Sequence, residues 1–208
     1  MPSLDLIRSR VAVHVPRLAA AGDAPVEPAV FEAAVAIVVH QAPDASPELL
    51  FIERAVREGD PWSGQMAFPG GRREAHDPHL ERTAARETHE EVGIRLGAPI
   101  GRLNDFQGTR ASEQRKLVVA PFVYEVRSRP PITVSDEVQS TVWISTAHLL
   151  DPSSARSYRF QRSEFGGTFP AIEYQGYTVW GLTYRILQDF FSVVGKELLH
   201  PPDAPTSS

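Results

Sequence analysis

The chain alternates between short apolar runs and segments rich in glycine and proline, a pattern typical of strands joined by loops. Five runs of apolar, β-branched or aromatic residues predict strands, and a shorter run lies inside a long, breaker-rich loop over residues 57–76. The expected strands are residues 34–40, 49–54, 66–68, 100–106, 117–126 and 139–144. The turn-rich segment between the first two predicts that they pair as a hairpin.

Helical spacing predicts one helix near each end of the chain. Residues 4–18 form the first, which a loop joins to the main body. Apolar residues recur every three or four positions from Val179 to about Leu199 and predict a helix that closes the chain. We expect the aromatic side chains of this last helix to pack in the core rather than to stack on bases. These residues are Trp180, Tyr184, Phe190 and Phe191.

A further helix can be bounded from local chemistry. Asp77 is a good N-cap, and Pro78 suits the first helical position because its missing N–H would have no partner there anyway. Gly93 can adopt the left-handed conformation that ends many helices. At about 100° per residue, one stripe of this helix faces the core. The members of the stripe are Leu80, Ala84, Thr88 and Val92.

Three carboxylates border this buried stripe. Glu87, Glu90 and Glu91 fall within a sector of ~100° beside it. One interpretation is a solvated helix face on which Arg86 and Glu90 form an i,i+4 ion pair. However, three acids beside the core repel one another unless a cation neutralises them, and oxygen-rich clusters are what magnesium and manganese prefer. The pattern therefore favours a divalent metal site.

The composition excludes several other chemistries. The 208 residues, at about 150 per domain, predict one domain with additions. The absence of cysteine excludes disulfide scaffolds, thiolate zinc sites, cysteine nucleophiles and iron–sulfur clusters. A formal charge of -5 does not suit a duplex-binding surface. No apolar run approaches the ~20 residues of a membrane span, and we find no secretory signal. We therefore expect a cytoplasmic protein that binds neither nucleic acid nor membranes.

Residues 71–94 resemble the signature of the Nudix hydrolases, in which a glycine, an acid and an Arg-Glu-x-x-Glu-Glu-x-Gly segment form a loop, a helix and a loop. The segment from Arg86 to Gly93 matches, apart from Thr88, where the common pattern has an aliphatic residue. The upstream acid is Asp77, and eight residues separate it from Arg86. This one-residue insertion with Asp is similar to the variant in the coenzyme A pyrophosphatase branch.

Two further segments are similar to that branch. Residues 50–71 place an arginine after an apolar strand and end in Gly-x-x-x-Phe-Pro-Gly-Gly, and residues 179–187 resemble the branch's final helix. The resemblance implies an α/β (α+β) fold, an α/β/α sandwich with a mixed sheet. It also implies a Nudix hydrolase domain, which we place at residues 28–200. The apolar spacing places an amino-terminal helix and linker before it, over residues 1–27, and the composition predicts a disordered tail after it, over residues 201–208.

The resemblance implies a role for each candidate residue. A metal-activated water would attack one phosphorus of a P–O–P bridge. Glu87, Glu90 and Glu91 would hold Mg²⁺ or Mn²⁺, the last two with a direct part in catalysis. Arg86 would orient a glutamate through an ion pair. Glu137 is the candidate base or additional ligand, with an exposed loop acid as the equal alternative.

Substrate contacts are expected from Arg54, Gly70, Gly71 and Arg72. The glycine pair lets the backbone turn tightly and approach a ligand closely. Arginine suits bidentate phosphate recognition, although Arg54 equally suits a surface ion pair. The expected substrate is a small nucleotide, first coenzyme A or an acyl derivative. The alternatives are ADP-ribose, NADH or an oxidised nucleoside triphosphate, and, in a different class, a nucleotide-sensing domain without turnover. The chain is expected to be a monomer or a homodimer.

Overall fold

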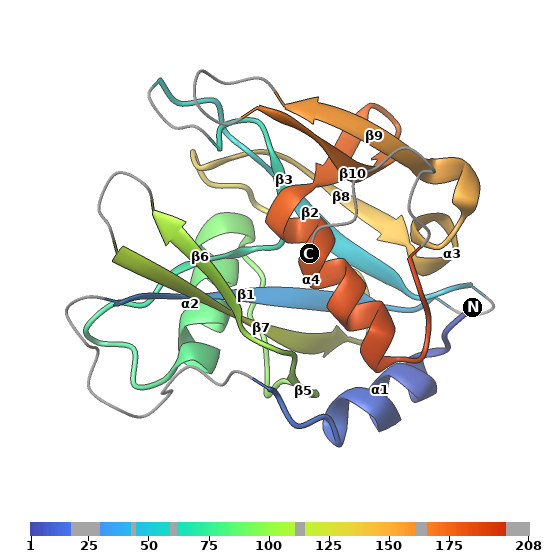
Figure 1. The fold of residues 1–208 in the computed structure, drawn as a ribbon. Helices are drawn as coiled ribbons and strands as arrows, with labels where there is room; N and C mark the ends of the chain where they lie inside the picture. The colour runs from blue at the N-terminus through green and yellow to red at the C-terminus, as the bar shows by residue number, and fades with distance from the viewer. Residues whose placement is uncertain (18–29, 43–44, 59–61, 111–114, 161–165, 199–208) are drawn as a thin grey trace.

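A mixed sheet of eight strands forms the centre of the described parts of the molecule (Figure 1). The structure is a computed structural model and describes residues 1–17, 30–42, 45–58, 62–110, 115–160 and 166–198. Five strands lie in the order β3 (Met66–Ala67), β2 (Glu48–Arg54), β1 (Val30–His40), β7 (Arg115–Val126) and β5 (Gly101–Arg102). Off this path, β4 (Gly70–Arg72) pairs with β1, β6 (Phe106–Arg110) with β7 and β8 (Val138–Ser145) with β2.

The two longest strands, β1 and β7, pair in parallel along the whole length of β1. β1 and β2 pair in antiparallel orientation, with Val39 opposite Leu49. This pairing confirms the expected hairpin. β1 begins at Val30 rather than at residue 34, because β7 continues to pair with it there. The expected strand over residues 100–106 divides instead into β5 and the start of β6.

Helices cover both faces of the sheet (Figure 1). Alternate residues of β2 point to opposite faces of the sheet. Leu49 and Phe51 pack in the cluster that includes residues of α4 (Gly181–Val193). Leu50 and Ile52 pack in the cluster that includes residues of α2 (Leu80–Val92). A strand buried on both faces reads as a continuous apolar run, as this one does. The layered α/β/α arrangement with a mixed sheet is therefore confirmed.

A second, three-stranded sheet was not expected from the sequence. It follows α3 (Thr146–Leu149) and the short 3-10 helix η1 (Pro152–Ser154), and it consists of β9 (Ala155–Phe160), β10 (Gly167–Tyr174) and β11 (Tyr177–Trp180) in antiparallel order. Gln175 and Gly176 both have positive φ, 49° and 90°. Two such residues in succession make the tight turn that matches the twist of an antiparallel hairpin, and β10 and β11 form that hairpin.

The helices at both ends of the chain are shorter than expected. α1 (Leu4–Ala12) ends before Val13 and Val15, and Pro16 disfavours helix in the residue before it. Val179 and Trp180 belong to β11 rather than to the last helix, which begins only at Gly181. That helix ends at Val193, two residues before a left-handed glycine. In the described ranges, the structure contains no helix that is long and apolar enough to span a membrane.

The expected tail over residues 201–208 lies outside the described residues, as does most of the expected linker up to residue 27. The division of the chain at these points therefore stays a prediction.

Candidate active site

The candidate acids lie on α2, which packs on β1 of the main sheet. Leu80, Ala84, Thr88 and Val92 are buried, as the helical spacing predicts. Thr88 fits where the family pattern has an aliphatic residue because its hydroxyl donates to the carbonyl of Ala84, 2.7 Å away, and so leaves no unpaired polar group in the core.

The boundaries of α2 confirm one expectation and correct another. Gly93 is left-handed, with φ of 76°, and ends the helix as predicted. The prediction that Asp77 caps the other end is wrong, because the helix begins at Leu80 after His79, which makes no capping hydrogen bond with its side chain. The prediction that Pro78 is the first helical residue fails with it. The carboxylate of Asp77 has other partners.

Asp77 is the buried anchor of an ionic network. Its side chain is only 1% exposed, and it accepts hydrogen bonds from the Glu74 N–H at 3.1 Å, the Thr83 hydroxyl at 3.0 Å and the guanidinium of Arg86 at 3.0 Å. Burial opposes its ionisation, but these hydrogen bonds outweigh burial and hold the pKa of Asp77 below its usual range. The network joins the loop before α2 to the middle of the helix.

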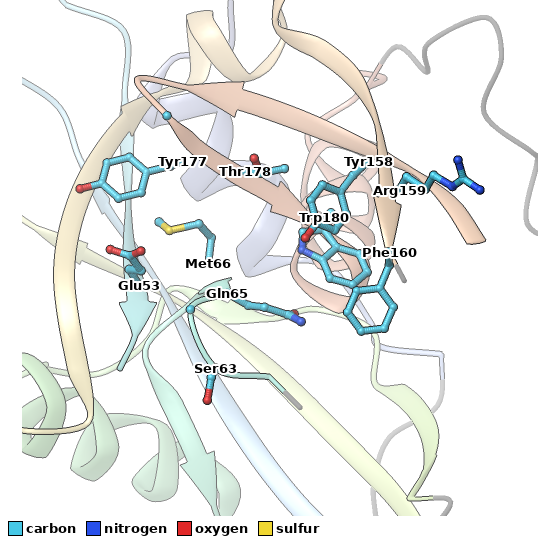
Figure 2. A pocket seen from close by; sticks show the side chains of 12 residues that line it. Glu53, Ser63, Gln65, Met66, Tyr158, Arg159, Phe160, Tyr177, Thr178 and Trp180 are labelled. Atoms are coloured by element: carbon cyan, nitrogen blue, oxygen red, sulfur yellow. The ribbon is translucent and has the colours of Figure 1, made fainter. Parts of the chain in front are cut away.

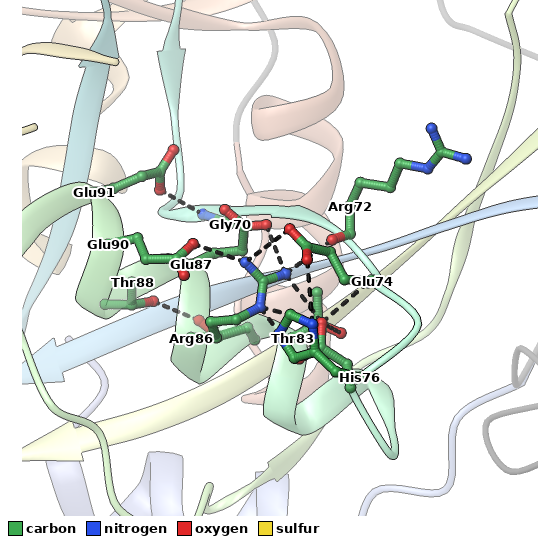
Figure 3. Close-up of polar contacts among 12 residues, drawn as sticks. Gly70, Arg72, Glu74, His76, Thr83, Arg86, Glu87, Thr88, Glu90 and Glu91 are labelled. Carbon is green, nitrogen blue, oxygen red and sulfur yellow. Dashed lines mark hydrogen bonds and ion pairs between the residues drawn. The ribbon is translucent and has the colours of Figure 1, made fainter. Parts of the chain in front are cut away.

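Arg86 lies at the centre of this network (Figure 3). Besides Asp77 it donates to Glu87 at 2.9 Å, to Glu90 at 2.7 Å and to the carbonyl of Arg72 at 3.0 Å. Burial disfavours its charge, yet Asp77 and Glu87 raise the pKa of Arg86 above its usual range. The predicted ion pair between this arginine and a glutamate is present, and so is the i,i+4 pair of the solvated-face interpretation.

The two candidate glycines contact two of the acids directly. The N–H of Gly70 donates to a carboxylate oxygen of Glu91 at 2.8 Å (Figure 3). A Cβ on Gly71 would lie only 2.5–2.6 Å from the carboxylate atoms of Glu87. A Cβ on Gly70 would instead collide with the backbone of the neighbouring strand at Ala34. The glycine pair therefore packs against the acids. A side chain at position 71 would displace Glu87, and one at position 70 would collide with β1.

The three acids of α2 differ in their solvent exposure. Glu91 is 3% exposed, and its burial raises its pKa to about 8, although the Gly70 N–H opposes the rise. Burial also raises the pKa of Glu87, and the nearby charges of Glu90 and Glu137 add to that rise while Arg86 opposes it. Glu90 is the outermost of the three, with its side chain 56% exposed. Mutually repelling carboxylates, two of them largely covered from water, are stabilised by any cation that reaches them.

Glu137 approaches the acids from a different part of the chain. It precedes β8, and its charge contributes to the raised pKa of Glu91. The N–H of Ser135 donates to the backbone carbonyl of Glu91 at 3.0 Å, which ties this loop to the end of α2. The side chain of Glu137 is 54% exposed and accepts from Arg57 at 3.3 Å. The structure therefore brings together the candidate base and the helix acids, and adds Arg57, which sequence reasoning did not single out.

The two remaining candidate arginines differ. Arg54, the last residue of β2, is partly buried, and its positive charge acts to lower the pKa of Glu91. The side chain of Arg72 points away from the acids in Figure 3 and lies over the ring of Phe31, with 4.1 Å from its guanidinium carbon to the ring centre. The structure thus places Arg54 near the acids but not the side chain of Arg72.

Arg73 supports the loop before α2, although sequence reasoning missed it. It donates to the carboxylate of Glu32 at 2.8 Å and to the backbone carbonyls of Asp77 and Pro78 at 3.2 and 2.8 Å. Glu32 is buried, and the side chain of Arg73 is only 10% exposed. No local signal identifies this pair, because Glu32 lies on β1, 41 residues earlier in the chain.

The donor chemistry of the cluster suits a hard divalent cation, since each candidate ligand is a carboxylate. Within the described ranges, no three acidic or histidine side chains are already arranged as a metal-binding group. Glu87 and Glu90 instead accept from Arg86. Metal binding by all three acids would therefore compete with Arg86 for these carboxylates.

Fold and site together define a class: a mixed sheet between helices, with a glycine turn packed on the acids of one helix. The NUDIX domain model matches residues 30–162, and the chain belongs to the Nudix family.

Relatives agree with this assignment. The chain is 30% identical over 148 residues to a human protein named mitochondrial coenzyme A diphosphatase NUDT8, covering 68% of this chain and 61% of that one. It is 38% identical over 112 residues to an uncharacterized protein of Schizosaccharomyces pombe, covering 51% of this chain. The matched regions span 34% of the yeast protein and just under two thirds of the human one.

A solved structure has the same fold. A MutT/nudix family protein from Enterococcus faecalis matches with a TM-score of 0.56 at 16% identity, covering 83% of this chain and 64% of that one. At this identity the match supports the fold alone.

Proposed function

We propose that the chain is a metal-dependent pyrophosphohydrolase that cleaves the diphosphate of a nucleoside diphosphate derivative. The observation that carries this proposal is the packing of the Gly70-Gly71 turn against the carboxylates of Glu87 and Glu91. This packing brings flexible backbone, which can approach a phosphate closely, next to buried acids that suit a cation. Metal-assisted diphosphate hydrolysis needs the cation and the phosphate at one point.

Glu87, Glu90 and Glu91 would hold the Mg²⁺ or Mn²⁺ ion. The ion supplies Lewis-acid polarisation of phosphoryl oxygens and a more acidic bound water. Arg86 fixes one carboxylate oxygen of Glu87, and the Gly70 N–H fixes one of Glu91, so that their orientation does not depend on the ion. Preset orientation of this kind lowers the reorganisation needed when substrate binds.

Glu137 and Arg54 would act on the substrate side. Glu137 would accept a proton from the attacking water, since it is exposed and lies close enough to Glu91 to influence its pKa. Arg54 would bind a phosphate oxygen, because its positive charge lies close enough to Glu91 to act on the pKa of that carboxylate. The backbone of Gly70 and Gly71, rather than the side chain of Arg72, would line the substrate on the helix side.

Coenzyme A or an acyl derivative is the proposed substrate, with 3′,5′-ADP and phosphopantetheine or its acyl form as products. The name of the human relative and the branch-specific segments at residues 50–71 and 179–187 support this choice. A cytoplasmic location, a monomeric or homodimeric state and a lack of nucleic-acid partners remain our expectations from the sequence.

One panel tests the proposal. The purified protein is incubated with coenzyme A, acetyl-CoA, ADP-ribose, NADH and an oxidised nucleoside triphosphate, with and without Mg²⁺ or Mn²⁺, and the products are identified by mass. Metal-dependent release of 3′,5′-ADP from coenzyme A is the expected result. Faster cleavage of another member of the panel would overturn the choice of substrate. Binding without any product would favour a nucleotide sensor and overturn the proposed activity.

A further inference from the structure

A cleft with aromatic walls lies between the second sheet and the edge of the main sheet (Figure 2). Its volume is about 480 Å³, within the range of about 300–1,000 Å³ typical of small-molecule sites. The main-sheet side contributes Glu53, Ser63, Gln65 and Met66, and the second sheet contributes Tyr158, Phe160, Tyr177, Thr178 and Trp180. Its lining overlaps the motif segments at residues 50–71 and 179–187, but the acid site described above does not include it.

Three aromatic rings form one wall of the cleft. The ring of Trp180 lies 4.6 Å from that of Tyr158 and 4.9 Å from that of Phe160, measured between ring centres. On the same sheet, Phe169 packs on Trp180 at 5.6 Å. Trp180 is 7% exposed, and Tyr158 and Phe160 are partly buried. Tyr158 and Phe160 are tilted by 35° and 37° from the Trp180 ring that supports them. A planar group can stack on aromatic rings held in this way at about 1–3 kcal/mol per base.

The opposite side of the cleft is polar. The carboxylate of Glu53 accepts from the Ser140 hydroxyl at 2.7 Å, and that hydroxyl lies 3.1 Å from the hydroxyl of Tyr177. These contacts hold the Glu53 side chain in place while leaving lone pairs for another donor, because a carboxylate accepts at about four positions. Gln65 adds a side-chain amide nearby (Figure 2). A planar ligand that donates an N–H at its edge suits this combination better than an aliphatic chain does.

A short stretch of backbone connects the cleft to the acid site. Arg54 follows Glu53 directly, and its N–H and carbonyl pair with Gln65 and Gly64, each at 3.0 Å. Arg54 is also the residue whose charge acts on Glu91. From Met66 the chain runs on to Gly70, which donates to Glu91. A ligand in the cleft is therefore next to the residues that frame the acids.

We infer that this cleft binds the adenine base of the nucleotide substrate. The base stacks on the partly exposed rings of Tyr158 and Phe160, which the buried Trp180 supports, and its exocyclic amine donates to Glu53. The inference rests on the proposed function, which places the diphosphate of the substrate between Arg54 and the acids of α2. Base binding itself requires no turnover, so it can be measured separately.

Equilibrium binding of 3′,5′-ADP and of phosphopantetheine to the full chain, measured by titration calorimetry in magnesium buffer, tests the stacking. Tyr158→Leu should weaken 3′,5′-ADP binding about tenfold, equivalent to about 1.4 kcal/mol, and leave phosphopantetheine binding unchanged. The matched control is Phe106→Leu. This residue lies on β6, which pairs with β7; neither strand contributes a residue to the cleft, and the loss of this ring should change neither affinity.

Base selectivity tests the role of Glu53. The wild-type protein should prefer 3′,5′-ADP to the corresponding inosine bisphosphate about tenfold, because hypoxanthine presents an acceptor where adenine has its amine. Glu53→Gln should remove most of this preference, since an amide both donates and accepts. A preference that is equally large in Glu53→Gln would overturn the assignment of Glu53.

The remaining outcomes decide the inference as a whole. Loss of phosphopantetheine binding in Tyr158→Leu, with 3′,5′-ADP unaffected, would assign the cleft to the other half of the substrate and overturn the inference. Unchanged binding of both would overturn it as well. Phe160→Leu repeats the test if Tyr158→Leu does not fold, as judged by circular dichroism. Tight 3′,5′-ADP binding that depends on Tyr158, in a protein that cleaves nothing, would support the cleft and refute the proposed activity.

Discussion

The acid site and the aromatic cleft lie next to each other but are built in opposite ways. The acid site is nearly contiguous in sequence, from Gly70 to Glu91, and charged hydrogen bonds around Arg86 hold it. The cleft is assembled from four separate segments, from Glu53 to Trp180, and packed rings form its wall. Local chemistry thus defines the first region, and tertiary packing defines the second.

The two regions also differ in what they contribute to stability. Burial of Glu91 with a raised pKa costs free energy in the absence of a cation. Packing of Trp180 against its neighbouring rings stabilises the fold. Substitution of Glu91 should therefore separate activity from stability, whereas substitutions in the cleft wall should affect ligand binding and packing together.

The largest expected effect is on turnover. Glu91→Gln should lower kcat more than about 100-fold, because even residues one shell beyond a metal ligand are worth 10–100-fold, while the circular dichroism spectrum stays unchanged. Glu81→Gln on the first turn of the same helix is the matched control and should retain activity. Near-normal metal-dependent activity of Glu91→Gln would contradict the assignment of this residue.

The same substitution should stabilise the metal-free protein. The folded-state pKa of Glu91, about 8, lies above its ordinary value of 4.5. Stability therefore falls as the pH rises from about 4.5 to 8, where the unfolded chain has lost a proton that the folded chain still holds. At pH 9, Glu91→Gln should raise the free energy of unfolding by on the order of 2 kcal/mol, measured by urea denaturation in EDTA. If Glu91→Gln and the wild type have the same free energy of unfolding at pH 5 and again at pH 9, the prediction is refuted.

The two glycines should respond differently to a single methyl group. In Gly70→Ala the Cβ meets backbone atoms of β1, which cannot move without breaking the strand pair, and we expect a loss of about 3 kcal/mol in stability. In Gly71→Ala the Cβ meets the end of the Glu87 side chain, which can move. In Gly71→Ala the rate of hydrolysis should therefore fall strongly, while the free energy of unfolding should change little. Thermal melts and initial rates on both variants check this, and the reverse order would contradict it.

Asp77→Asn should cost about 2 kcal/mol at neutral pH, because it removes a buried charge opposite Arg86 while Glu87 and Glu90 still pair with that arginine. The folded-state pKa of Asp77 lies below its ordinary value of 3.8. Its stabilising effect is therefore complete above about pH 4 and is lost as the pH falls through the folded-state pKa. The stability difference between the variant and wild type, measured by urea denaturation at pH 7 and pH 3, should shrink at the lower pH. A constant difference would contradict the charge interaction.

The smallest effect is expected for Thr183, which contacts the cleft residue Met66 from α4. The Thr183 hydroxyl, buried on α4, donates to the carbonyl of Met66 at 2.9 Å. Thr183→Val should cost about 1 kcal/mol, the usual net value of one such hydrogen bond, with unchanged kcat. Chemical denaturation and initial rates measure both, and a large loss of kcat would show that α4 has a role at the acid site.

The sequence predicts the acid site far better than the cleft, and the reason is physical. The positions of Leu80, Ala84, Thr88 and Val92 on α2 follow from helical geometry, and so does the sector that contains the acids. Intervals of three or four residues on one helix leave a pattern that can be read without knowledge of the fold. The role of Asp77 did not follow from such a pattern, because the sequence predicts an N-cap whereas its carboxylate pairs with Arg86, nine residues further on.

The parts that the sequence did not predict depend on distant contacts. Trp180 was assigned to a helix because apolar residues continue at helical spacing past it. Positive φ at Gln175 and Gly176 instead makes a hairpin, and strand pairing with β10 places this residue opposite Ala171. The Arg73–Glu32 pair is equally invisible, since nothing near either residue identifies the other.

The most direct test of the account is hydrolysis of coenzyme A in water labelled with oxygen-18, in the presence of Mg²⁺ or Mn²⁺, with products analysed by mass. The account predicts that 3′,5′-ADP and phosphopantetheine appear, that one labelled oxygen enters one of their phosphates, and that Glu91→Gln forms both products more than about 100-fold more slowly. Absence of labelled products from coenzyme A, ADP-ribose and NADH with either metal would contradict it.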